Sequence, residues 1–200
     1  IFFNQKNNVV LAEKEVRQAL ALAIDKDKII NDIFKGGARS IDGPILPDSF
    51  GYNSANKKYF FDMTQAARLL EAAGWKKVEI NDVSLALAEK EREDSDKKIK
   101  KEAENKLAIG IGKWRRKSDK FLSVKLTAVD NKENAQITEI IKNSWQELGV
   151  KTEIDLVSIP QIGGSIIKTR NFEALLYGQI VGADPDPYML WHSSQAGGNG

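Results

Sequence analysis

The alternation of strand and helix patterns after Leu122 constrains the fold of this chain more than any other feature. Short runs of apolar and β-branched residues are separated by stretches in which apolar residues recur at helical spacing. Helices of this length between strands favour right-handed crossovers and a largely parallel sheet. We therefore expect strands near 122–129, 151–157 and 172–177, helices over 133–148 and 160–169, and an edge or linking strand at 1–4.

Helical spacing also marks the first half of the chain. One helix is expected around Val16–Ala23, a second is capped by Asp25, and a third is capped by Asp62 and ends at Gly74. The stretch between the second and third helices, 38–56, is rich in glycine and proline and is typical of a surface loop.

The segment Asn81–Gly112 differs in character from the rest of the chain. Nearly every residue from Glu89 to Lys106 is charged, and only Ile99 and Ala103 form an apolar pair at i, i+4. This pattern predicts a long, mostly solvated helix or a pair of helices. The basic cluster that follows, Lys113–Lys117, favours a solvated hairpin over a phosphate site, because acidic stretches flank it.

A stiff, acidic and aromatic turn follows the last predicted strand. Two prolines, Pro185 and Pro187, fix φ and push Asp184 and Asp186 towards extended geometry. Ligands of open α/β sheets bind beyond the carboxyl ends of the strands, so this turn is a candidate site. On the residues alone, the two acids could bind a ligand's cation or a hard metal, act as an acid and base pair, or accept backbone N–H bonds within the loop.

Other chemistries have weaker support in the sequence. His192 is the single histidine and cysteine is absent, so a structural histidine is favoured over a metal ligand or a base. Ser193 is not part of a Gly-x-Ser-x-Gly elbow, and Gly110–Gly112 lacks the third glycine of a dinucleotide site. The formal net charge of +2, with acids and bases interspersed, gives no field that would attract nucleic acid or an anionic membrane.

Several segments together resemble a known family. The motifs after the last strand are Tyr177–Gln179, Ala183–Tyr188 and Trp191–Ser194. They are similar to the second crossover region of the family 5 extracellular solute-binding proteins of peptide ABC transporters, which include dipeptide, oligopeptide and nickel binders. The resemblance covers most of the chain outside about 81–112, and it continues in the family's order at Phe3-Asn4, Val16–Asp25, Ala66–Trp75, Leu126-Thr127 and Leu148–Val150.

This resemblance implies an α/β fold, a periplasmic-binding-protein-like (type II) lobe with a mainly parallel or mixed sheet flanked by helices. Residues 1–200 would form a single lobe of a larger two-lobe protein, with Asn81–Gly112 as a charged helical insertion. Members are usually more than twice this length and the chain begins without methionine, so we expect an excised piece. Arg17 looks like the family's regular arginine, expected to hold the lobe together through a buried ion pair or carbonyl contacts.

The resemblance also implies a function. Such a protein captures an extracellular solute, most directly a peptide, between two lobes and delivers it to a membrane permease. It is not an enzyme and needs no cofactor; nucleic acid is not a partner, and a monomer is expected. It works outside the cytoplasmic membrane, in a periplasm or at the cell surface, with a lipid anchor as one form of attachment. A binder of a metal complex or oligosaccharide, or a carboxylate-dependent hydrolase, remains an alternative.

The resemblance assigns ligand-binding residues to the turn. Asp184 matches the aspartate that peptide-binding members place opposite the ligand's α-ammonium. The spacing Asp-Pro-Asp-Pro is one residue shorter than the usual pattern, so Asp186 is a rival. Gln179, Tyr188 and Trp191 complete the expected set, and an aromatic ring facing the cleft would suit a side-chain pocket of a peptide.

Overall fold

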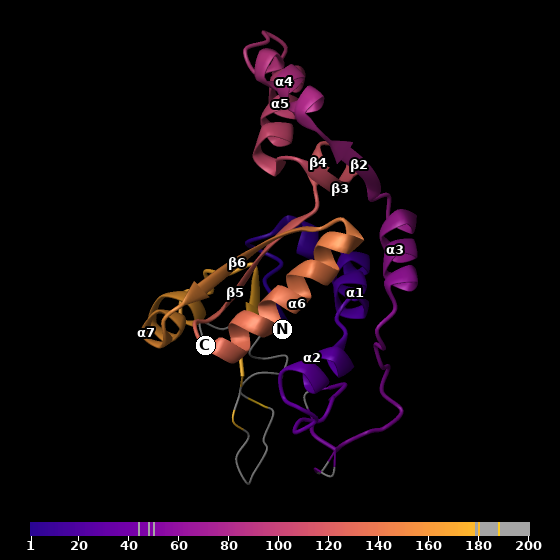
Figure 1. The fold of residues 1–200 in the computed structure, drawn as a ribbon, viewed down its shortest axis with the longest axis vertical. Coiled ribbons are helices and arrows are strands. Elements are labelled where there is room, and N and C mark those ends of the chain that lie inside the picture. The colour runs from indigo at the N-terminus through magenta and orange to yellow at the C-terminus, as the bar shows by residue number, and fades with distance from the viewer. Residues whose placement is uncertain (44, 48, 50, 179, 181–187, 189–200) are drawn as a thin grey trace.

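The chain folds into a main lobe with a smaller attached unit (Figure 1). The computed structural model describes residues 1–43, 45–47, 49, 51–178, 180 and 188. The strands are β1 (Phe2–Phe3), β2 (Lys76–Ile80), β3 (Gly112–Lys117), β4 (Lys120–Phe121), β5 (Ser123–Val129), β6 (Lys151–Val157) and β7 (Ala174–Leu176). The helices are α1 (Lys14–Leu22), α2 (Lys26–Asp32), α3 (Met63–Ala72), α4 (Asp82–Glu91), α5 (Lys97–Ile109), α6 (Lys132–Leu148) and α7 (Ile159–Gln161), with a 3-10 turn η1 (Val9–Ala12) and a π-helix η2 (Ile162–Ile167).

The main lobe is built on a mixed sheet of order β1-β7-β5-β6. Its central strand β5 pairs in parallel with both β6 and β7, and β1 lies antiparallel at the edge beside β7. The predicted β5–α6–β6 unit forms as expected, and Gly149 ends α6 with φ +95. The predicted helix over 160–169 is divided between α7 and η2. The prediction of a mainly parallel or mixed sheet is therefore confirmed.

Helices cover both faces of this sheet. Leu126 and Ala174 belong to the main core with Trp145 of α6, whose indole N–H donates to the Leu20 carbonyl of α1 at 3.0 Å. Leu175 points to the opposite face, where it packs with the isoleucines of η2. Because side chains alternate between the two faces of a strand, even the short β7 contributes residues to the cores on both sides of the sheet.

The predicted caps of the first half are confirmed. Asp25 accepts a hydrogen bond from the backbone N–H of the third residue of α2, and Asp62 does the same for α3, at 2.9 and 2.8 Å. Gly74 follows α3 with φ +92. Arg17 donates to two carbonyls of η1 at 2.8 and 2.9 Å, so the expected carbonyl contacts are present and hold α1 against this turn.

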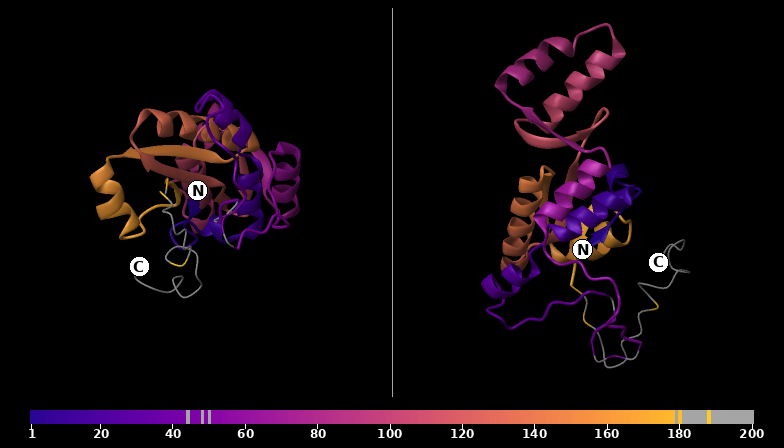
Figure 2. Two further views of the ribbon diagram at one scale, coloured as in Figure 1. Left: turned by 90° about the horizontal axis from the view of Figure 1, so that it is seen from below. Right: turned by 90° about the vertical axis from the view of Figure 1, so that its right-hand side faces the viewer.

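Residues 76–121 form a separate unit, which we call the arm. It consists of the three-stranded antiparallel sheet β2-β3-β4 and the helix pair α4 and α5, and Figure 2 shows it standing above the main lobe. Ile80, Ile109 and Trp114 form a small core of its own. The predicted pair of charged helices is confirmed. The hairpin expected at Lys113–Lys117 forms between β3 and β4. The expectation that it is solvated is wrong, because Arg115 is completely buried.

Arg115 joins the arm to the main lobe. Its Nε donates to the Leu148 carbonyl and its Nη1 to the Trp75 carbonyl, both at 2.8 Å, and Glu71 lies 3.4 Å from its Nη2. Burial lowers the pKa of Arg115, and the attraction of Glu71 reverses only part of this shift. Lys77 donates to the Glu147 carbonyl at 3.0 Å. Two cations of the arm therefore lie at the carboxyl end of α6, where the helix dipole favours positive charge.

The main lobe makes the reciprocal contact. Lys151, the first residue of β6, donates to the carbonyls of Ile109 and Ala108 at 2.7 and 3.2 Å, which places a cation at the carboxyl end of α5. Lys117 of the arm binds both carboxylate oxygens of Glu13 at 3.0 Å. The arm is thus held by charged hydrogen bonds to backbone carbonyls and to the Glu13 carboxylate.

The first prediction concerns Arg115. Replacing it with methionine (Arg115→Met) leaves two buried carbonyls without donors, and we expect a loss of about 3 kcal/mol in the free energy of unfolding. Urea denaturation followed by circular dichroism measures this. Lys113→Met, at an exposed position of the same strand, is the matched control and should change the stability little. Equal losses for the two variants would contradict the role given to Arg115.

The second prediction concerns α4 and α5. Residues 82–107 can be replaced by a short glycine-containing turn, because Ile80 and Gly112 are already partners across β2 and β3 and because Ala108 and Ile109, which bind Lys151, are kept. We expect a folded lobe with a melting temperature lowered by less than about 10 °C, since segments with few core contacts contribute little to global stability. Excision of 76–117, which also removes Arg115, is the control and should unfold the lobe. A fall of tens of degrees for the smaller deletion would contradict this.

Candidate functional site

The carboxyl ends of the three parallel strands lie side by side. Strand β5 ends at Val129 between β7 and β6, with Val129 opposite Val157 and Ala128 opposite Leu176. The segments that leave these strands therefore start next to one another, since neighbouring strands lie about 4.8 Å apart. In open α/β sheets this edge is where ligands bind.

The loop that leaves β5 is held firmly. The backbone N–H of Asp130 donates to the Val157 carbonyl at 2.8 Å and continues the ladder one step beyond the strand. Asn131 then caps α6 by accepting from the Asn134 N–H at 2.8 Å, and the Asn134 side chain donates to the Val129 carbonyl at 3.0 Å. The amino end of α6, which favours negative charge, is thereby fixed at this edge.

The neighbouring strands end in polar and aromatic groups. Ser158, directly after β6, forms a capping box in which its N–H and Oγ donate to Gln161 Oε1 at 3.0 and 2.8 Å. Ile159 follows with 73% of its surface exposed. Tyr177, directly after β7, is 43% exposed. The edge thus offers an aromatic ring, a carboxylate and an apolar side chain on three adjacent segments.

Most of the residues expected at the site lie beyond these segments. Gln179, Asp184, Asp186 and Trp191 fall outside the described residues, as does His192. Tyr188 is described and is 44% exposed. The roles assigned to these residues in ligand binding therefore stay predictions.

Sequence reasoning missed the acid and the hydroxyl of the neighbouring loops. Asp130 and Ser158 are each the first residue after a predicted strand. A polar residue in that position was the available signal. Its meaning depends on the strand order, which places both loops beside the end of β7.

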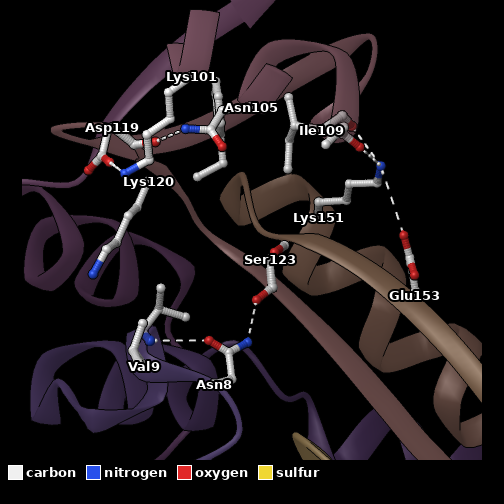
Figure 3. A pocket seen from close by; sticks show the side chains of 13 residues that line it. Asn8, Val9, Lys101, Asn105, Ile109, Asp119, Lys120, Ser123, Lys151 and Glu153 are labelled. Carbon is white, nitrogen blue, oxygen red and sulfur yellow. Dashed lines mark hydrogen bonds and ion pairs between the residues drawn. The ribbon is translucent and has the colours of Figure 1, made fainter. Parts of the chain in front are cut away.

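A groove of about 410 Å³ lies at the opposite end of the strands, under the arm (Figure 3). Ser123 and Lys151, the first residues of β5 and β6, line it. Most of its polar groups bind one another: Lys101 pairs with Asp119 at 2.6 Å, and Asn105 donates to the Asp119 carbonyl at 2.7 Å. The direct hydrogen bond from Lys101 lowers the pKa of Asp119. We interpret this groove as the seam between arm and lobe.

Two further searches concern the described residues only. They contain no group of three or more histidine, cysteine, aspartate or glutamate side chains placed to hold a metal ion. Among these same residues, no helix has both the length and the apolar character needed to cross a membrane.

The family comparison covers the whole chain. The model of the bacterial extracellular solute-binding proteins, family 5 Middle, matches residues 1–200. The oligopeptide-binding protein AppA of Bacillus subtilis strain 168 is 23% identical over 202 residues, which span 98% of this chain and 31% of that protein. The dipeptide-binding protein of Escherichia coli K12 is 39% identical over 67 residues, or 34% of this chain and 12% of that protein. The chain thus spans about a third of the length of AppA.

Solved structures show the same fold. AppA from Bacillus subtilis in complex with a nonapeptide superposes with a TM-score of 0.69 at 22% identity, covering 96% of this chain and 33% of that one. NikZ from Campylobacter jejuni in complex with Ni(L-His) gives 0.68 at 22% identity, covering 96% and 32%. These similarities confirm the predicted periplasmic-binding-protein-like (type II) α/β lobe.

Proposed function

We propose a function from one premise: this chain belongs to family 5 of the bacterial extracellular solute-binding proteins. It forms a lobe of the substrate-binding component of an ABC transporter, which captures a solute between two lobes and passes it to a membrane permease. The observation that carries this proposal is the family match over the full 200 residues. The protein binds its solute and performs no chemistry on it.

The path of the chain through the sheet supports a two-lobe protein. The chain enters along β1 and leaves along β7, and these strands are antiparallel partners, Phe2 with Leu175. The start of β1 and the end of β7 therefore both lie at the carboxyl edge of the sheet. Asn4 and Asn7 fix this arrangement, because each side chain donates to the Arg170 carbonyl at 2.8 Å. Two adjacent crossover strands suit a hinge that closes over a ligand.

A peptide is the proposed solute. The relatives bind peptides by name: AppA was solved with a nonapeptide, and the Escherichia coli relative is a dipeptide-binding protein. The sequence Asp184-Pro185-Asp186-Pro187, which predicts a stiff turn, offers carboxylates to a peptide's α-ammonium. The complex of NikZ with Ni(L-His) supports a metal complex as the second candidate.

The remaining assignments follow from the same premise. We place the protein in a periplasm or on the cell surface, as a monomer with a permease as partner and a lipid anchor on the full-length protein. We also assign Asn81–Gly112 as an insertion into a single lobe that spans residues 1–200. The main core, which contains no residue of that segment, supports this assignment.

The test of the function is to purify the full-length protein and identify the small molecules that accompany it by mass spectrometry. Peptides are expected. Residues 1–200 alone, purified in the same way, are the matched control and should carry none, because half of the contacts of a two-lobe site are missing. A metal chelate or a sugar in place of peptides would contradict the peptide assignment, and ligand retained by the isolated lobe would contradict the two-lobe site.

A further prediction concerns Asp184. In the full-length protein, Asp184→Asn keeps the shape of the side chain and removes its charge. Breaking a desolvated pair with the α-ammonium typically costs about 2 to 5 kcal/mol. Affinity should therefore fall at least tens of fold for free peptides and barely at all for N-acetylated ones. Calorimetric titration with matched free and acetylated peptides measures the difference.

Asp186→Asn is the control for this experiment. We assign Asp186 to capping the turn or the segment after it, so its replacement should have a much smaller effect. The reverse result, with Asp186→Asn abolishing binding and Asp184→Asn harmless, would show that the motif is aligned two positions away. No effect from either change would favour the metal complex.

A further inference from the structure

Asp130 carries an inference about which peptides are selected, and this inference rests on the proposed function. We propose that the Asp130 carboxylate contacts the bound ligand and selects peptides that carry a basic side chain. The ligand chemistry is that of a lysine ammonium or an arginine guanidinium, separate from the α-ammonium assigned to Asp184.

The position of Asp130 is the first argument. It follows β5, the strand with a parallel partner on each side, at the edge of the sheet where β1 begins and β7 ends. Its neighbours in the adjacent loops are Ser158, after β6, and Gly178, two residues beyond the end of β7. A ligand held over this edge would pass over the end of the central strand.

The rigidity of its support is the second argument. The hydrogen bond from the Asp130 N–H to the Val157 carbonyl fixes one side of the residue, and the Asn131 cap of α6 fixes the other. A binding group on a backbone held in this way loses little conformational freedom when a ligand arrives. The amino end of α6 favours a negative charge at this point.

The third argument is that this carboxylate is uncommitted. Within the part of the chain that the structure describes, the Asp130 side chain has no hydrogen bond or ion pair, whereas Glu13 and Glu173 are held by partners of the main lobe or arm. The nearest charges in sequence, Lys132 and Glu133 in the first turn of α6, are exposed and opposite in sign. Asp130 therefore presents a net negative charge to the edge.

An exposed aromatic ring lies on the neighbouring strand end. The register of β5 with β7 places Ala128 opposite Leu176, so Tyr177 leaves the sheet one strand away from the Asp130 loop. A peptide that passes over this edge would meet both the carboxylate and the ring. Ser158 adds a polar group on the other side.

The test uses the full-length protein and two probes: the peptide Ala-Lys-Lys-Lys-Ala, and the same peptide with each lysine acetylated at Nε. The probes share their backbone and their free α-ammonium, and they differ in the side-chain charge. Wild type should bind the charged peptide more tightly. Asp130→Asn should lower its affinity roughly tenfold and leave the acetylated peptide unaffected, so that the preference disappears.

Glu133→Gln is the matched control, because it removes one negative charge from the same helix end without touching Asp130. It should keep the preference. Melting temperatures distinguish a structural role. If Asp130 were purely structural, Asp130→Asn would lower the melting temperature and weaken the binding of both peptides equally, and this result would overturn the inference. Equal binding of the two peptides by wild type also overturns it and leaves the peptide function intact. If the full-length protein binds neither probe and no peptide accompanies it in the mass-spectrometric test, both this inference and the proposed peptide function are overturned.

Discussion

The structure depends on a set of cations that meet the carbonyl ends of helices across the seam between arm and lobe. Arg115 and Lys77 of the arm bind the last carbonyls of α6, and Lys151 of the lobe binds those of α5. Each contact satisfies backbone acceptors that a helix cannot satisfy itself. A buried guanidinium needs several acceptors in fixed positions, so it specifies one relative placement of the two units where an apolar contact would tolerate several.

This seam uses the amino end of the parallel sheet and leaves the carboxyl end for the proposed ligand site. Lys151 and Ser123 begin their strands under the arm, whereas Val129 and Val157 end them at the open edge. The two tasks therefore lie at opposite ends of the same strands. Stabilising charges at the seam can change without altering the ligand edge, and loops at that edge can vary without loosening the arm.

The sequence predicted the parts of the fold that depend on local patterns. The β5–α6–β6 unit and the caps at Asp25 and Asp62 follow from periodicity and side-chain chemistry within a few residues. Strand β2 was missed and β3 was predicted as part of a solvated hairpin, because their lysines and Arg115 look solvated. Their partners, such as the Glu147 carbonyl 70 positions after Lys77, are set by tertiary structure. The edge of the sheet was predictable, because the pattern predicts a parallel sheet. The proposed role of Asp130 was not, because it depends on which loops are neighbours, and strand order decides that.

The pairing of β1 with β7 has a consequence for how such a protein can change over time. Because the chain enters and leaves the sheet along adjacent strands, the start of β1 near Ile1 and the end of β7 near Tyr177 lie next to each other. A unit whose ends lie together can be exchanged between related proteins as a single cassette without disturbing its own core, as in circular permutation and domain insertion. Recombination at these two points would exchange this lobe's share of the proposed two-lobe binding site in one event.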